Sequence, residues 1–175
     1  PLFGNLPEPK ASEDIKPMEQ FDQGWGTILY RTTLPAVTSG TTLLITEVHD
    51  WAQVYANGKL LGRLDRRRGE NSLKLPALTA GTRLDILGRV NFDKAIHDRK
   101  GITEKVELLN EGSTQELKNW QVYSFPVDYP FVKDKKYAPG KKLDGPAYYR
   151  ATFNLEETGD VFLDMQTWGK GMVWV

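Results

Sequence analysis

The chain has 175 residues, 39% of them hydrophobic and 11% aromatic, which is enough to fill one well-packed core. Its 23 Lys and Arg residues balance its 23 Asp and Glu residues, and this neutrality argues against binding to nucleic acid or to an anionic membrane surface, both of which need a basic excess. The absence of cysteine excludes disulfides and Cys-type zinc sites, and no apolar run approaches the roughly 18 residues of a membrane span.

The beginning of the chain predicts an edge segment followed by a long strand. Residues 1–16 are rich in Pro and charge and indicate a linker or an edge segment, and residues 17–21 predict a first short strand. Gly24-Trp25-Gly26 predicts a turn. Residues 27–34 are rich in β-branched and aromatic side chains and end before Pro35, as a strand does.

A β-hairpin is the clearest local prediction. Asn57-Gly58 lies between two short apolar runs, and a type I′ turn needs positive φ at both central residues, which Asn and Gly tolerate best. Trp51 stands at the mouth of this hairpin. A strand over residues 41–48 precedes it, and Gly62-Arg63 predicts a bend in the outgoing strand.

Further strands follow at short and fairly regular intervals, separated by turns. Residues 72–76 and 82–87 alternate polar and apolar side chains, as do residues 102–109, and residues 120–125 predict another strand. No segment has a convincing helical period. This spacing predicts an all-β protein with a jelly-roll or galactose-binding-domain-like β-sandwich.

Two polar stretches interrupt this pattern. Residues 88–101 form a long polar loop that contains Phe92 and His97. Arg66-Arg67-Arg68 is the one basic cluster, and because Asp65 and Glu70 flank it, we interpret it as a solvated loop tip.

The order of motifs around the hairpin recurs near the end of the chain. Tyr30-Arg31 is followed by Trp51, and Tyr149-Arg150 is followed by Trp168 at nearly the same spacing. Such internal similarity predicts two related β modules in tandem. We therefore expect a jelly-roll domain over residues 1–127, with its N-terminal edge segment, and a connector with an incomplete second module over residues 128–175.

Several of these motifs together resemble a known family. They are Ile28–Thr32, Asp50–Tyr55, Asn57-Gly58, Leu61–Arg63, Gly88–Asn91, Asp98–Ile102 and Trp120. In this order they resemble the carboxy-terminal β region of family 35 glycoside hydrolases, the β-galactosidases. Residues 145–149 and 168–171 resemble the start of the next jelly roll in that family. The family usually has additional residues between the strand that ends at Leu87 and the Gly88-Arg89 motif, which follow each other directly here.

The resemblance implies a partner domain and a role for one loop. It implies jelly-roll modules packed against a catalytic (β/α)₈ barrel that carries both catalytic Glu residues, and a periplasmic, extracellular or lysosomal location. It also implies that the aromatic residue at Phe92 sits on a loop that leans towards the galactose pocket of the barrel. A galactoside is then a candidate ligand.

The sequence predicts no independent catalytic residues, no metal site and no cofactor. Retaining glycosidases need two carboxylates about 5 Å apart, and nothing pairs Glu47, Asp50, Asp85 and Asp98. The two histidines, His49 and His97, are far apart in the chain and lack the spacing of a zinc motif. His49-Asp50 could form an oriented histidine, but neighbouring strand residues point to opposite faces.

Three functions remain open: a non-catalytic β-sandwich that buttresses a β-galactosidase-like barrel, an autonomous carbohydrate-binding module, and a structural interdomain or oligomer interface. We favour the first. An aromatic wall with a few polar groups predicts a sugar site. The candidate residues are Phe92, Arg89, Asn91, Trp51 and Trp25. We expect Trp120, Trp168 and Trp174 to be core residues instead.

Overall fold

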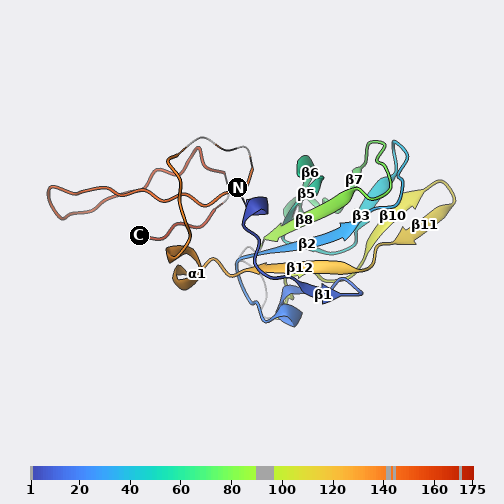
Figure 1. Ribbon diagram of the computed structural model, residues 1–175, viewed down its shortest axis with the longest axis horizontal. Helices are drawn as coiled ribbons and strands as arrows, with labels where there is room; N and C mark the ends of the chain where they lie inside the picture. The colour runs from blue at the N-terminus through green and yellow to red at the C-terminus, as the bar shows by residue number, and fades with distance from the viewer. Residues whose placement is uncertain (1, 90–96, 141–142, 144, 170) are drawn as a thin grey trace. The chain divides into compact units, whose positions relative to one another are not determined.

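The computed structural model describes the chain except residues 1, 90–96, 141–142, 144 and 170 (Figure 1). The chain forms two compact units. The larger unit is Asn5–Pro126, and the smaller unit combines the first four residues with Val127–Val175. The larger unit carries every β-strand of the described residues.

Antiparallel strands build the larger unit into two main sheets and a short ladder (Figure 1). The first sheet has the order β1 (Lys10–Ser12), β12 (Trp120–Phe125), β2 (Thr27–Thr33), β8 (Arg83–Arg89), β5 (Trp51–Ala56) and β6 (Lys59–Asp65). The second has the order β11 (Ser113–Glu116), β10 (Val106–Asn110), β3 (Thr42–Ile45) and β7 (Ser72–Lys74). β4 (Val48–His49) pairs with β9 (Gly101–Ile102). The predicted all-β sandwich is confirmed.

The core lies between the two main sheets because alternate residues of each strand point inward. Ile28 and Tyr30 of β2 belong to the same buried cluster as Leu43 of β3 and Val106 of β10. Trp120 is 1% exposed and meets the Tyr30 ring edge-on, with 6.5 Å between ring centroids. Its position as a core residue is confirmed.

The hairpin forms where the sequence predicts it. β5 and β6 pair across Asn57-Gly58, whose φ values are 48° and 85°. Positive φ at both residues is the requirement of a type I′ turn. The Asn57 side chain also accepts a hydrogen bond from the Arg83 backbone N–H at 3.0 Å, which ties the turn to β8.

Two expected strands differ from the prediction. Residues 17–21 form a 3₁₀-helix, η2 (Met18–Phe21), in which Gln20 N–H donates to the Pro17 carbonyl. The apolar pair Met18 and Phe21, three residues apart, is buried on one side of this turn. The expected strand 41–48 is divided into two strands with different partners: β3 pairs with β10, and β4 pairs with β9.

β8 is continuous through the segment that the sequence predicted to be a shortened loop. Leu87 pairs with Leu29 and Gly88 with Ile28, so the ladder with β2 is uninterrupted at this point. The other short elements are η1 (Leu2–Gly4) and η3 (Arg66–Arg68), which are 3₁₀-helices, and α1 (Tyr129–Lys133).

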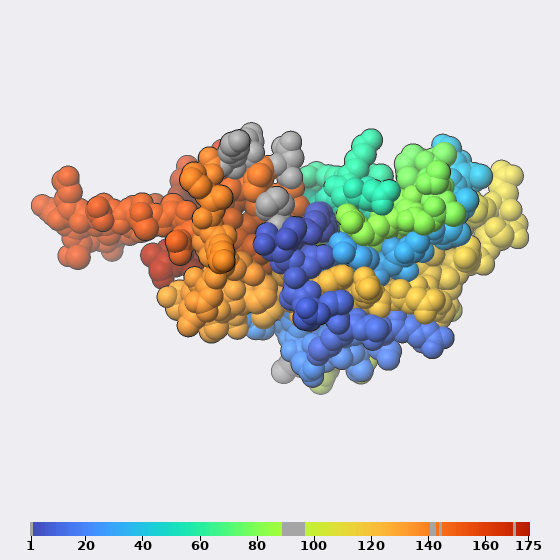
Figure 2. Space-filling view, viewed as in Figure 1, coloured from blue at the N-terminus to red at the C-terminus, as the bar shows by residue number. Residues whose placement is uncertain are grey.

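The smaller unit contains α1, and none of its described residues is in a strand. Residues 149–153 and 173–174, which belong to the expected second module, are not in strands in the structure. Trp168 and Trp174 are 55% and 51% exposed, so their expected burial is wrong. No described residue of the smaller unit belongs to a sheet that could cover them. Figure 2 shows this segment in orange and red.

Candidate functional site

Three of the predicted site residues lie at one end of the first sheet. Trp51 begins β5 and is paired directly with Arg89 at the end of β8. Thr27, two residues after Trp25, is the partner of Arg89 on the other side. Trp25 and Trp51 are both half-buried. The sheet therefore brings the two Trp residues and Arg89 to the edge from which the polar loop leaves.

Two of the predicted site residues, Asn91 and Phe92, lie outside the described residues, as does the rest of segment 90–96. The structure describes both ends of the loop, however. On the N-terminal side, Arg89 belongs to β8 and pairs with Trp51 of β5. On the C-terminal side, residues 97–100 lead into β9.

The returning side of the loop is held by a cluster of charged residues, which we call the loop-root cluster: Asp50, Arg66, Asp98 and Lys100. Arg66 Nη1 donates to Asp98 Oδ2 at 2.7 Å and to Asp50 Oδ1 at 3.2 Å. Lys100 Nζ donates to Asp98 Oδ2 at 3.2 Å and lies 3.6 Å from Asp50 Oδ2. Asp50 is fully buried, so its two cationic partners compensate a charge that would be costly alone.

Arg66 occupies this cluster instead of a solvated loop tip. Its side chain is 31% exposed, and its backbone N–H donates to the Asp50 carbonyl at 2.9 Å. Arg67 agrees with the expectation, since it is exposed and donates to both carboxylate oxygens of the flanking Asp65. Arg68 alone of the three is exposed without a described ion pair.

His49 is oriented by residues other than Asp50. Its Nδ1 lies 3.1 Å from Asp98 Oδ1 and contacts the Arg99 carbonyl, and its Nε2 lies 2.9 Å from Glu47 Oε2. The partners of His49 are thus Asp98 and Glu47, and the argument that neighbouring strand residues point to opposite faces agrees with this arrangement. The Asp50 carboxylate is instead committed to Arg66, a cation from η3.

Backbone contacts continue the attachment into β9. Lys100 N–H donates to the Glu19 carboxylate at 2.8 Å, and Met18 N–H donates to the Lys100 carbonyl at 2.9 Å. The buried Tyr30 hydroxyl accepts from Ile102 N–H and donates to the Lys16 carbonyl. Burial raises the pKa of Tyr30, which keeps this hydroxyl neutral and able to donate.

The loop-root cluster is unsuited to glycoside hydrolysis. Burial acts to raise the pKa of Asp98, but hydrogen bonds from Arg66 and Lys100 outweigh it, so the pKa lies below its usual value. A general acid of a glycosidase needs the opposite shift. Its other buried carboxylate, Asp50, is also held by Arg66. This arrangement positions a chain segment and does not supply a reacting acid.

The described part of the chain contains neither a metal-binding group of side chains nor a membrane-spanning helix. No group of three or more His, Cys, Asp or Glu side chains there could hold a metal ion. No helix among these residues has both the length and the apolar character needed to cross a membrane.

Sequence reasoning missed the loop-root cluster although it singled out most of its members. Arg66 lies 16 residues from Asp50 and 32 from Asp98, so no local spacing links them. The one signal was the basic run Arg66–Arg68, which lies in the chain between the acidic residues Asp50 and Asp98.

The fold and site together define a class: an all-β sandwich domain in which a charged cluster ties Asp98 and Lys100 to Asp50 and Arg66. Comparison with known proteins specifies it further. Residues 16–126 match the family model "Beta-galactosidase, first all-beta domain", and residues 146–175 match "Beta-galactosidase, galactose-binding domain". The chain belongs to the family of β-galactosidase all-beta domains.

Curated relatives agree with this assignment. The chain is 35% identical over 99% of its length to a β-galactosidase of Xanthomonas manihotis. It is 30% identical over its whole length to a β-galactosidase-1-like protein 3 of Mus musculus, and 30% identical over 87% of its length to a β-galactosidase of Bos taurus. The chain spans 29%, 28% and 26% of these proteins, respectively.

Proposed function

We propose that this chain is the non-catalytic β-sandwich region of a β-galactosidase-like glycoside hydrolase. In that enzyme it packs against and supports a catalytic barrel, and the loop after β8 forms part of the wall of the galactoside site. Residues 1–127 act as the supporting jelly-roll domain, and residues 128–175 are the connector and the start of a second module.

One observation carries the proposal: the loop is anchored at both ends at the same edge of the sheet. Arg89 is fixed by pairing with Thr27 and Trp51, while Asp98 and Lys100 are fixed by the loop-root cluster. Fixed ends lower the conformational entropy that a segment between them loses when it binds a ligand.

Five residues carry the proposed sugar contact: Phe92, Arg89, Asn91, Trp51 and Trp25. Phe92 supplies an apolar wall for the C–H face of the sugar, and Arg89 and Asn91 supply hydrogen bonds to its hydroxyls. Trp51 and Trp25 lie at the same end of the sheet as Arg89, where they support the loop or extend the apolar wall of the sugar site.

Replacement of Phe92 tests this function. Phe92→Ala in the full-length enzyme should raise KM or lower kcat for a galactoside several-fold, because it removes a wall of the site without touching the sandwich core. Phe153→Ala is the matched control, since Phe153 is 58% exposed in the smaller unit and should leave the kinetics unchanged. Unchanged kinetics for Phe92→Ala, with an unchanged unfolding midpoint, would reject the proposal.

The autonomous carbohydrate-binding module is the second candidate, because residues 146–175 match a model described as a galactose-binding domain. Titration of galactose or lactose into the 175-residue chain, followed by Trp fluorescence, separates the two functions. Saturation below ~1 mM, about −4 kcal/mol, would favour the autonomous module. No saturable signal would favour the supporting domain.

A further inference from the structure

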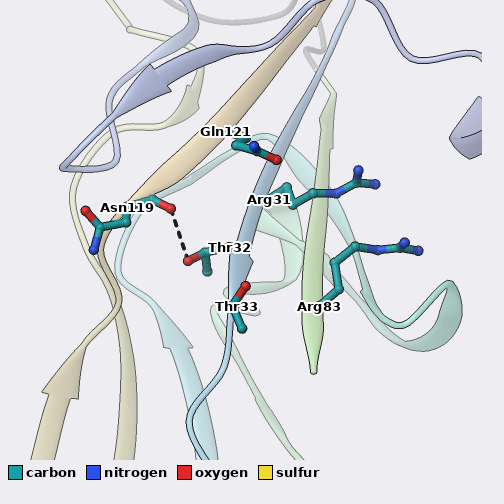
Figure 3. A pocket seen from close by; sticks show the side chains of 6 residues that line it. All are labelled: Arg31, Thr32, Thr33, Arg83, Asn119 and Gln121. Carbon is teal, nitrogen blue, oxygen red and sulfur yellow. Dashed lines mark hydrogen bonds between the residues drawn. The ribbon is translucent and has the colours of Figure 1, made fainter. Parts of the chain in front are cut away.

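A second concentration of polar groups lies at the other end of β8. A depression with a volume of about 450 Å³ lies at β2, β8 and β12. Figure 3 shows the side chains that line it. It lies wholly within the larger unit. Its lining is rich in hydrogen-bond donors: Arg31, Thr32, Thr33, Arg83, Asn119 and Gln121.

Two guanidinium groups dominate this depression. Arg31 and Arg83 extend in the same direction from neighbouring strands (Figure 3). Between them lies Asp85, which is fully buried. Arg31 Nε donates to Asp85 Oδ1 at 2.6 Å, and Arg83 Nε donates to Asp85 Oδ2 at 2.9 Å. Two cations and one anion leave a single positive charge at the depression.

Asp85 occupies only part of the Arg83 donor set. The bond to Asp85 uses Nε, and neither terminal nitrogen of Arg83 has a hydrogen-bond partner within the described residues. The Arg83 side chain is 41% exposed, against 16% for Arg31. Arg83 therefore offers the open side of its guanidinium to solvent.

The neighbouring side chains fix the geometry of this group. The Arg31 guanidinium lies over the Tyr123 ring, 5.2 Å from its centroid, which limits its movement. Tyr123 Oη donates to Gln121 Oε1 at 3.1 Å, so the Gln121 amide nitrogen remains as a donor at the depression. Thr33 adds an exposed hydroxyl from the end of β2.

We propose that this depression binds a carboxylate-bearing sugar, such as a uronic acid. The planar fork of Arg83 matches the two oxygens of a carboxylate, and the net positive charge favours an anion over a neutral sugar. The Gln121 amide and the Thr33 hydroxyl suit sugar hydroxyls. The volume lies within the range of small-ligand sites.

This site is distinct from the proposed galactoside wall. Arg83 begins β8 and Arg89 ends it, so the two places are separated by the length of the strand, about 20 Å. Each can therefore be tested without altering the other.

The test is a titration of D-galacturonate into the 175-residue chain, followed by calorimetry, with D-galactose and acetate as comparison ligands. D-galacturonate should bind saturably and at least fivefold more tightly than either, because it alone carries both the carboxylate and the ring hydroxyls. Arg83→Gln should weaken this binding at least fivefold, and Arg83→Lys, which keeps the charge but loses the fork, should weaken it less. Arg63→Gln, an exposed arginine of β6 on the same face, should change it less than twofold.

Three results would overturn the proposal: no saturation at 10 mM D-galacturonate, equal binding of D-galactose, or unchanged binding by Arg83→Gln. Thr33→Val serves as a second variant with a smaller expected loss if Arg83→Gln unfolds the chain. Phe92→Ala should leave D-galacturonate binding unchanged, and Arg83→Gln should leave galactoside hydrolysis by the full-length enzyme unchanged. The two variants therefore show separately whether the galacturonate site or the galactoside wall is wrong.

Discussion

Asp98 joins the returning side of the loop to three groups at once. It accepts from Arg66 and Lys100 and contacts His49, although the three lie on different segments of the chain. Because both cationic partners keep Asp98 ionised, the attachment of this segment depends on pH.

The direction of that dependence follows from the lowered pKa of Asp98. The folded state holds the proton of Asp98 more weakly than the unfolded state, so the carboxylate adds stability at neutral pH. This contribution is complete above about pH 5 and is lost as the pH falls through the ordinary pKa near 3.8 and below it. Urea unfolding between pH 2.5 and 6 should therefore show a steeper loss of unfolding free energy for the native chain than for Asp98→Asn.

Asp160→Asn is the matched control, since Asp160 is exposed in the smaller unit. Its pH profile should follow that of the native chain. A profile for Asp98→Asn that coincides with the native one would show that Asp98 has no part in the acid sensitivity.

The sequence located these charged residues but not their partners. It named Asp50 and Asp98 as carboxylates that no sequence pattern pairs, and Arg66 as a loop residue. Their mutual contacts depend on the packing of β5, η3 and β9, which neither periodicity nor spacing reports. Phe92 and Asn91 remain predictions, since they lie outside the described residues.

At the scale of elements, β9 has only two residues, and Gly101 is one of them. Its φ is +86°, a conformation that side chains other than glycine rarely adopt. A Cβ at this position would collide with the Tyr30 hydroxyl, which already bridges Lys16 and Ile102. The end of the polar loop thus requires glycine for two independent reasons.

Gly101→Ala should lower the free energy of unfolding by about 3 kcal/mol, the sum of a left-handed backbone and an overpacked contact. Gly24→Ala is the control, because a Cβ at Gly24 would meet nothing within 4 Å. Denaturant unfolding measures both. A loss below about 1 kcal/mol for Gly101→Ala would contradict this account of β9.

Elements whose cause is local were predicted, and those whose cause is tertiary were not. Asn57-Gly58 predicts its hairpin because the turn conformation is a property of those two residues. The division of residues 41–48 into β3 and β4 depends on a change of partner strand, and the η2 turn depends on burial of Met18 and Phe21. Neither cause is present in the alternation of side chains.

At the scale of the whole chain, the apolar surface is distributed unevenly. Leu60 is the only large apolar residue of the larger unit that is exposed in the described structure. All others lie in the smaller unit, where Phe162 is 93% exposed and Trp168 is 55% exposed. Exposed apolar side chains promote association in solution when they gather into patches.

A chain shortened to residues 5–126 should therefore bind less of a hydrophobic dye and scatter less light than the 175-residue chain at equal concentration. Its unfolding midpoint should be nearly unchanged, because the core cluster lies wholly within the retained residues. Equal dye binding by both chains, or an unfolded shortened chain, would contradict the division into two units.

The strand order of the first sheet also has a consequence during synthesis. β2 lies between β12 and β8, both of which come much later in the chain. Because the ribosome adds roughly 5–20 residues per second, several seconds pass before β8 and β12 are synthesised. During this time the backbone N–H and C=O groups of β2 have no partner strand. Tyr30 and Ile28, which are buried in the folded sandwich, are exposed during that interval. Chaperones should therefore bind the nascent chain most strongly before Phe125 emerges from the ribosome.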